Sequence, residues 1–194
     1  MSDDPYVYPG SSVLKNKIGL TSQAELDEAE RLVSTTRALQ GIPTGQFDLA
    51  HLQAIHRHLF QDIYDWAGKL RTVEISKGGH QFMFRQFIHT GMADVHRRIV
   101  ANGFFVGLEA EVFSEQVGPI IGDVNYVHPF REGNGRTQLQ YLKQLCEQAG
   151  HYLDLRCIDA EGWMAASRRA HHADYRPMSA ALGDALAQSR RIGV

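Results

Sequence analysis

The chain has 194 residues, 43% of them apolar, and a formal net charge of −2. This length suits one domain with its own core, and the balanced charge argues against a strongly basic nucleic-acid binder. The acidic start has no apolar leader, no run approaches about 18 apolar residues, and Cys146 and Cys157 fit no zinc spacing. We therefore expect one cytoplasmic domain over residues 1–194 that neither enters a membrane nor binds nucleic acid directly.

Helical spacing of apolar residues marks the first part of the chain. Ser22 and Glu25 form a capping-box pattern at the start of a first helix, which Gly41 and Pro43 end. Asp48 is placed to cap a second helix. The residues expected to face the core are Leu26, Ala29, Leu32, Val33 and Leu39 in the first helix and Leu49, Leu52, Ile55, Leu59 and Phe60 in the second.

The stretch at residues 71–84 interrupts this helical pattern. Residues 71–75 alternate like a strand, residues 76–79 have turn chemistry, and residues 80–84 can return as a second strand. A two-stranded hairpin is marginal on its own, so it must pack against the helices. By itself this pattern favours a structural connector, with a mobile flap as the alternative.

The rest of the chain again predicts helices. They are expected at about residues 88–103, 112–124, 137–150, 160–173 and 177–191. Pro119 lies inside the second of these and is expected to kink or split it. The residues expected to face inward are Ile88, Met92, Val95, Ile99, Val112, Phe113, Val117, Ile120, Ile121, Val124, Leu139, Leu142, Leu145, Cys146, Met178, Leu182 and Leu186.

Candidate chemistry is concentrated at residues 128–136, where His-Pro-Phe-Arg-Glu-Gly-Asn-Gly-Arg joins two predicted helices. Gly133 and Gly135 allow a tight backbone path before a helix N-terminus, where free N–H groups and the helix dipole favour an anion. Arg136 adds a cation suited to phosphate oxygens, and Glu132 is a carboxylate suited to Mg²⁺ on phosphates. His128 titrates near neutrality and can accept a proton from a hydroxyl.

Each of these residues has a simpler explanation when it is taken alone. A single histidine is usually structural, a Gly-x-Gly is usually a turn, and a charged residue near a helix start is usually solvated. Their coincidence within nine positions is what indicates function. An anion site, a metal carboxylate, a cation and a base together indicate transfer of a phosphate-containing group, by positioning and electrostatics.

This segment matches the signature His-Pro-Phe-x-(Asp/Glu)-Gly-Asn-Gly-Arg-x-x-Arg through Arg136, and the chain thereby resembles the Fic family. The likeness continues in the Tyr-Pro-Gly run at residues 8–10 and the Leu-Lys-Asn run at residues 14–16, as in small bacterial Fic toxins. It also includes the pattern at residues 56–68 before the hairpin. In all, the resemblance covers about residues 5–175.

The resemblance implies an all-α fold, a Fic-type helical bundle with a short β-hairpin flap. The bundle core would span about residues 5–175 and a C-terminal helix about residues 177–191. The implied activity is AMPylation with ATP as co-substrate. The implied roles are general base for His128, Mg²⁺ binding for Glu132, a backbone anion hole for Gly133, Asn134 and Gly135, phosphate binding for Arg136, and loop anchoring for Pro129 and Phe130.

The resemblance also implies two protein partners. The flap, with Lys77, Gly78 and Phe82, would dock the target segment as an added strand. With the resemblance, the interpretation of the hairpin as a flap is therefore favoured over that of a structural connector. A type II topoisomerase subunit is the first target to test. No segment near either end matches the inhibitory pattern (Ser/Thr)-x-x-x-Glu-(Gly/Asn), so the inhibitor is expected to be a separate small antitoxin with an inhibitory helix.

Leu139 departs from the signature, which has its last arginine at this position. In the family this arginine helps to hold the nucleotide phosphates and pairs with the inhibitory glutamate. The change removes five donors and a positive charge. Three consequences compete: a weaker hold on the distal phosphates, loss of the inhibitory contact, or a different donor nucleotide. Arg131 and Lys143 are candidates to compensate.

Three hypotheses about function follow. The first is a protein AMP-transferase that acts as the toxin of a toxin–antitoxin pair. The second is an enzyme that moves another phosphate-containing group, such as UMP or phosphate. The third is a weakened Fic fold that serves as a binding module. Intact His128, Glu132 and Arg136 argue against the third hypothesis, whereas Leu139 argues for it.

Overall fold

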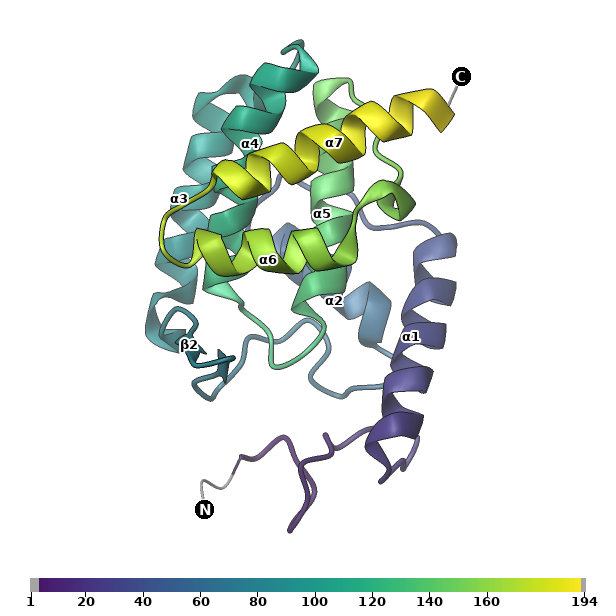
Figure 1. Ribbon diagram of the computed structural model, residues 1–194. Coiled ribbons are helices and arrows are strands. Elements are labelled where there is room, and N and C mark those ends of the chain that lie inside the picture. Colours follow the sequence, from purple (N-terminus) through teal and green to yellow (C-terminus); the bar gives the residue numbers. More distant parts are fainter. Residues whose placement is uncertain (1–3, 193–194) are drawn as a thin grey trace.

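Seven α-helices and one short hairpin are found in residues 4–192, which the computed structural model describes (Figure 1). The elements are α1 (Gln23–Leu39), α2 (Leu49–Phe60), β1 (Ser76–Lys77), β2 (His80–Gln81), η1 (Arg85–Phe87), α3 (Ile88–Ala101), η2 (Gly103–Phe105), α4 (Ala110–Val127), α5 (Asn134–Ala149), η3 (Leu155–Cys157), α6 (Ala160–Ala170) and α7 (Arg176–Ile192). The expected all-α fold with a hairpin is therefore confirmed.

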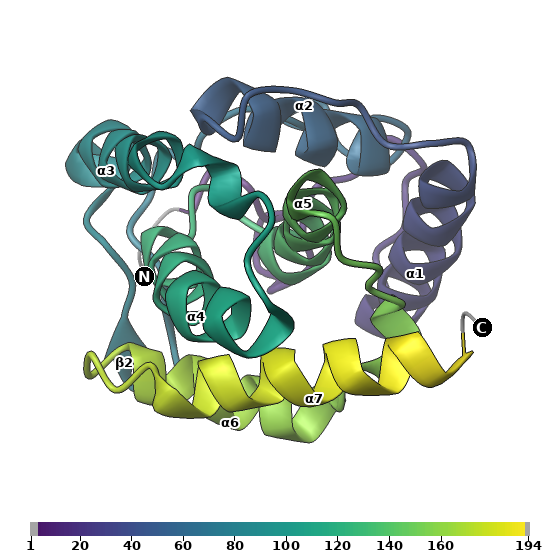
Figure 2. The same ribbon diagram turned by 90° about the horizontal axis from the view of Figure 1, so that it is seen from above.

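Helix α5 lies in the middle of the molecule, with α4 beside it and the other helices around this pair (Figure 2). α5 packs against α2 and α4, and α4 also packs against α3, α6 and α7. The loop that joins α4 to α5 lies at one end of this central pair, on the same side of the molecule as the hairpin (Figure 1). The buried core thus supports the segment in which the sequence concentrates its chemistry.

Several helix boundaries follow from the local signals in the sequence. The carboxylate of Asp48 accepts a hydrogen bond from the N–H of His51 at 2.8 Å and so caps α2. Gly150 ends α5 with a φ of 95°, a conformation that glycine adopts at low cost. α4 continues through Pro119 as one helix, so the expected split is wrong. Its packing against four other helices offsets the hydrogen bond that proline cannot donate.

The buried face of α1 differs from the expected one. Leu32 and Leu39 are 66% and 85% exposed, so their predicted inward placement is wrong. The buried residues of α1 are Leu26, Glu30 and Ser34, which form a narrow stripe at intervals of four. Ser22 precedes the helix as predicted, but its side chain makes no capping hydrogen bond. The inner face of α1 therefore carries a carboxylate among the core residues.

The hairpin is much shorter than predicted. Ser76 pairs with Gln81 and Lys77 with His80, and the two glycines between them form the turn. Residues 76–77, which were expected in the turn, are thus the first strand, and residues 71–75 are not strand. The legs share one further backbone hydrogen bond, from the N–H of Phe82 to the carbonyl of Ile75 at 3.2 Å, and the N–H of Met83 bonds to the carbonyl of Tyr126 in α4 at 3.0 Å.

The later helices match the prediction with two exceptions. Val112 is 41% exposed, and Leu139 is half-buried. The remaining predicted core positions of these helices are buried, namely Ile88, Met92, Val95, Ile99, Phe113, Val117, Ile120, Ile121, Val124, Leu142, Leu145, Cys146, Met178, Leu182 and Leu186. Within residues 4–192, none of the helices is both long and apolar enough to cross a bilayer.

Candidate active site

His128 is the first residue after α4, and its backbone is left-handed, with φ 45° and ψ 62°. The Nδ1 atom of its ring lies 2.9 Å from the backbone carbonyl oxygen of Asn125. A carbonyl oxygen can only accept, so this contact assigns the ring proton to Nδ1. The other nitrogen, Nε2, then carries a lone pair, as a general base requires.

The hairpin covers this imidazole. The ring of Phe82 stacks on that of His128, with centroids 3.7 Å apart and planes 15° apart. Burial is the main reason why the pKa of His128 is lowered to about 3, and the cations Arg71 and Lys77 lower the pKa further. The imidazole is therefore neutral at pH 7, the form that can accept a proton. Of the predicted flap residues, Phe82 reaches His128, whereas Lys77 and Gly78 lie exposed at the hairpin.

The loop after His128 is anchored by buried side chains. Phe130 has no exposed surface, and the side chain of Asn134 bonds both its N–H and its carbonyl, at 3.0 and 2.8 Å. This contact makes the side chain of Asn134 a brace that closes the loop. The sequence prediction concerned only the backbone of Asn134 and did not foresee this contact.

His56 on α2 holds the middle of the same loop, a role that was not expected from the sequence. Its Nε2 donates to the carbonyl of Glu132 at 2.9 Å, because its Nδ1 accepts from the N–H of Gly68 at 2.8 Å. Its ring also stacks on Phe130, with centroids 3.9 Å apart. Burial lowers the pKa of His56 to about 4, so it is neutral at pH 7. Its place in the pattern before the hairpin was the available signal.

The two glycines of the loop have different roles. Gly133 has a φ of 80°, and a Cβ atom there would lie 2.5 Å from the ring of Phe60, so the backbone itself needs glycine. Gly135 has no such φ, and a Cβ there would meet nothing within 4 Å. The first hydrogen bond of α5 runs from the N–H of Thr137 to the carbonyl of Gly133, at 3.1 Å. The N–H groups of residues 134–136 therefore precede the helical ladder, as at an anion-binding helix start.

Arg136 lies beside this helix start and pairs with Glu30 of α1. Its guanidinium also lies 4.7 Å from the centre of the Phe60 ring and 3.8 Å from the carboxylate of Glu132. Glu30 is buried and also accepts a hydrogen bond from the hydroxyl of Tyr64. The buried carboxylate of Glu30 was not predicted from the sequence, because the inward face of α1 was expected to be apolar.

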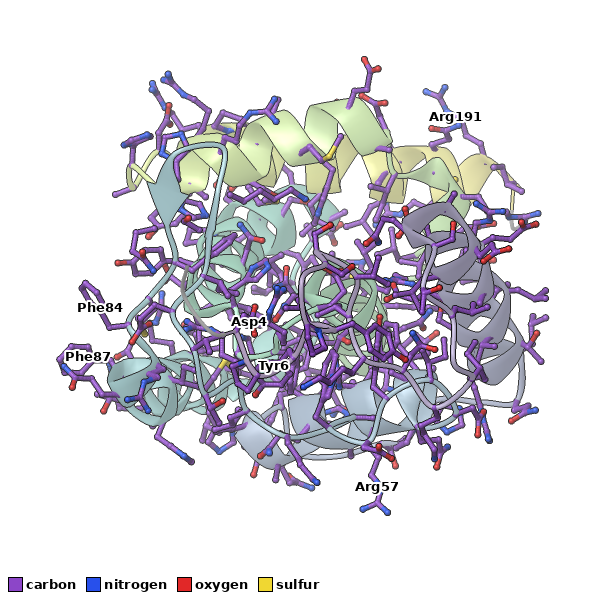
Figure 3. All side chains as sticks on the ribbon, turned by 90° about the horizontal axis from the view of Figure 1, so that it is seen from below. Asp4, Tyr6, Arg57, Phe84, Phe87 and Arg191 are labelled. Carbon is purple, nitrogen blue, oxygen red and sulfur yellow. The ribbon has the colours of Figure 1, made fainter. Side chains whose placement is uncertain are left out.

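A cavity of about 470 Å³ opens next to Arg136. It is lined by Ser12, Leu14, Gln23, Asp27, Glu30, Arg31, Arg131, Glu132 and Arg136. Arg131 thus lies near the phosphate-binding candidate, held by Asp4 at 2.8 Å, and Figure 3 shows Asp4 on the face that the N-terminal segment crosses. Lys143 instead pairs with Glu147 at 3.7 Å and does not line the cavity. Of the two candidates to compensate for Leu139, only Arg131 is in place.

A larger cavity, of about 1470 Å³, lies elsewhere, between α4 and α7. None of the predicted site residues lines it. Its charged lining includes Asp174, which pairs with Arg169 and Arg176 at 2.6 and 2.9 Å. Size alone therefore does not identify the site of chemistry: of the predicted site residues, Glu132 and Arg136 line the smaller cavity, whereas His128 lines neither cavity.

Glu132 meets the requirements for a Mg²⁺ site that is completed by phosphates. Its carboxylate is 48% exposed at the mouth of the cavity and accepts one hydrogen bond, from the N–H of Gly133 at 2.8 Å. Free lone pairs remain on both oxygens. Magnesium ions in such sites take one or two protein carboxylates and keep phosphate and water ligands. The donor chemistry of Glu132 fits this pattern.

Comparison with known proteins bears on the family and the fold. The Fic/DOC family model matches residues 46–146. A probable protein adenylyltransferase of Sinorhizobium fredii is 36% identical over 181 residues, which cover 93% of this chain and 94% of that protein. The N-terminal Fic domain of an effector protein from Bartonella sp. AR 15-3 has a TM-score of 0.88 at 25% identity, covering 97% of this chain and 93% of that one.

A second solved structure, an N-terminal Fic domain from Bartonella quintana with bound ADP, has a TM-score of 0.85 at 28% identity. It covers 93% of this chain and 94% of that one. Together with the helical fold, these relatives make the chain a nucleotidyltransferase. It belongs to the Fic/DOC family.

Proposed function

We propose that the protein transfers AMP from ATP to a hydroxyl group of a Ser, Thr or Tyr in another protein. The observation that carries the proposal is the neutral imidazole of His128, whose Nε2 is left as an acceptor five positions before Gly133, the residue that precedes α5. The Sinorhizobium relative is named an adenylyltransferase, and the Bartonella quintana domain binds ADP. Both support ATP as the donor.

In this reaction the hydroxyl oxygen of the target attacks the α-phosphorus of ATP, and His128 accepts the hydroxyl proton at Nε2. The bond between the α-phosphorus and the bridging oxygen breaks, and pyrophosphate leaves. The N–H groups of Asn134, Gly135 and Arg136 stabilise the charge that develops on the α-phosphate oxygens. The N–H of Gly133, which the resemblance also assigns to the anion hole, donates instead to the carboxylate of Glu132 at 2.8 Å. The guanidinium of Arg136 neutralises the leaving phosphates.

Glu132 is the residue that would hold Mg²⁺ on the phosphates of ATP. When bound, the ion neutralises phosphate charge and orients the leaving group. The chain's own contribution is the position of this carboxylate. The hydrogen bond from the N–H of Gly133 and the bond from His56 to the Glu132 carbonyl fix it at the mouth of the cavity.

The hairpin is the proposed docking surface for the target. Lys77 and Gly78 are exposed at its short strands, and an extended target segment can pair with such an edge. Phe82 covers the ring of His128, so its side chain must move aside when a target hydroxyl approaches that ring. Docking on the hairpin and access to the base are thereby linked.

We further propose that the protein is the toxin of a toxin–antitoxin pair and that a type II topoisomerase subunit is a target. The cavity next to Arg136 can accept an inhibitory glutamate from a separate small antitoxin. Growth of a bacterial host gives a direct check. Expression of the wild-type protein should arrest growth, whereas His128→Ala should not, and labelling of purified topoisomerase subunits should identify the target.

The activity itself is tested with purified protein, Mg²⁺ and a bacterial lysate, using ATP labelled at either the α- or the γ-phosphate. Label from the α position alone is the expected result. His128→Ala should abolish transfer while circular dichroism shows an intact fold. Label from the γ position alone would instead show phosphate transfer. In a parallel reaction with α-labelled UTP, label from UTP alone would show UMP transfer. No label from any nucleotide would support the hypothesis that the protein is a binding module, which the loss of the last signature arginine at Leu139 favours.

A further inference from the structure

Arg71 is a buried arginine between the hairpin and the end of α4, and the proposed chemistry gives it no role. Its side chain has no exposed surface. Arginine is almost never fully buried without partners, because its charge must be compensated inside the protein. The partners of Arg71 therefore show what it does.

The guanidinium of Arg71 has an acceptor for each of its five N–H donors. Nε donates to the backbone carbonyl of His128 at 2.8 Å. The other acceptors are the carbonyl of Val73 at 2.9 Å, a carboxylate oxygen of Glu74 at 3.1 Å, the carbonyl of Met83, and the carbonyl of Val127 at 3.5 Å. The backbone N–H of Arg71 also donates to the carbonyl of Pro129 at 2.9 Å.

These acceptors belong to three segments, all of which the side chain of Arg71 contacts. Val73 and Glu74 lie in the leg that leads into the hairpin, and Met83 lies in the leg that leaves it. His128 follows the last turn of α4. A single rigid, planar guanidinium thus joins both legs of the hairpin to the backbone of the proposed base.

The backbone of His128 needs such a restraint. Its left-handed conformation is uncommon for a residue with a side chain and persists only where the surroundings hold it. Arg71 holds the carbonyl of His128, and the carbonyl of Asn125 holds its Nδ1. Because the direction of a side chain follows from its backbone, fixing the carbonyl also aims the imidazole.

We propose that Arg71 is a positioning residue, which sets the orientation of the His128 imidazole and couples that orientation to the seating of the hairpin. The proposal rests on the proposed role of His128 as the base. A target strand that shifts either leg of the hairpin moves a carbonyl that shares the guanidinium with His128. Target docking and the aim of the base therefore change together.

The activity test compares Arg71→Lys and Arg71→Gln with wild-type protein in the labelled-ATP assay. Lysine keeps the charge but has no planar fork, so it cannot reach all three segments. The rate at saturating ATP should fall by about 10- to 100-fold, as for a misplaced catalytic group. The Kd of ATP should stay within about twofold, because other contacts hold residues 132–136. The matched control is Arg85→Gln, since Arg85 is exposed and also contacts Glu74, and it should behave as wild type.

A second measurement separates this proposal from the proposed function. Nitrogen-15 NMR of the histidine rings, assigned with His128→Ala, reports which nitrogen carries the proton. Wild-type His128 should show the proton at Nδ1, and Arg71→Lys should show a mixture of the two tautomers. If wild type transfers no label, the proposed function fails while the ring signals still test the coupling. A folded Arg71→Lys variant with wild-type ring signals would overturn the proposal that Arg71 positions His128.

Arg71→Lys displaces a buried charge and Arg71→Gln removes it, so a gentler change covers the case in which neither variant folds. Glu74→Gln weakens one of the five acceptors, and its side chain is 40% exposed, so the fold should survive. The ring signals of His128 should shift in the same direction as expected for Arg71→Lys, by a smaller amount. Unchanged ring signals in folded Glu74→Gln would also overturn the proposal.

Discussion

The ring of Phe82 lies flat on the imidazole of His128, with the two centroids 3.7 Å apart. Because this cover comes from the hairpin, we expect Phe82→Ala to expose the imidazole and to raise its pKa from about 3 toward the ordinary value of 6.5. An NMR titration of the ring protons measures this. Phe84→Ala is the matched control, because Phe84 is exposed and points outward (Figure 3). A pKa that does not move in Phe82→Ala would show that the hairpin is not what buries the ring.

The two loop glycines distinguish a structural requirement from a functional one. Gly133→Ala should destabilise the protein, because alanine would have to adopt the φ of 80° at this position and its Cβ would lie 2.5 Å from the ring of Phe60. Gly135→Ala should leave the free energy of unfolding equal or raise it by up to about 1 kcal/mol, since alanine favours a helix. It should still weaken ATP binding, because the Cβ stands where phosphate approaches the backbone. Urea denaturation and calorimetric titration check the two effects, and unchanged ATP affinity in Gly135→Ala would argue against the anion site.

Glu30 is the buried partner of Arg136, so its loss should cost stability. Glu30→Ala leaves the hydroxyl of Tyr64 and the guanidinium of Arg136 without their shared acceptor. We expect the free energy of unfolding to fall by about 2–3 kcal/mol. Glu28→Ala, on the exposed side of the same helix, should change it by no more than about 0.5 kcal/mol. Similar losses in the two variants would show that the buried pair contributes no more than a surface pair.

Local signals account for what the sequence predicted well. The cap at Asp48, the turn at Gly150 and the loop at residues 128–136 depend on residues within a few positions of one another. Such signals act before tertiary packing and survive it. The start of α5 and the place of His128 at the end of α4 follow from them.

The contacts that complete the site could not be predicted in this way, because they join distant parts of the chain. Glu30 and Arg136 are 106 positions apart, His56 and Glu132 are 76 apart, and the partners Arg71 and His128 are 57 apart. Which face of α1 turns inward depends on how α1 packs against α2 and the loop. Apolar spacing predicted that Leu32 and Leu39 face the core, but both are exposed. Glu30, which pairs with Arg136, is buried instead.

Buried His56 should make the stability of the protein depend on pH. Its pKa is about 4 in the folded state, below the ordinary value of 6.5, so the unfolded chain binds the proton more readily. The stability is complete above about pH 6.5, falls as the pH drops toward about 4, and levels off below that. The loss from this residue is about 3 kcal/mol. Urea denaturation across this range should give a shallower pH dependence for His56→Gln than for wild type, and equal slopes would contradict the burial effect.

Leu139→Arg tests whether the signature's missing arginine limits the enzyme. Position 139 lies one turn after Arg136 on α5, and Leu139 is half-buried there, so a longer side chain can extend toward the cavity at the helix start. One added charge-assisted contact is worth about 1.5–3 kcal/mol, which corresponds to an ATP affinity about 10- to 100-fold higher. Leu139→Met controls for size without charge and should match wild type. If affinity and transfer rate are unchanged or lower in Leu139→Arg, a weak hold on the phosphates is not what the leucine causes, and Arg131, which also lines the cavity, is the candidate for that role.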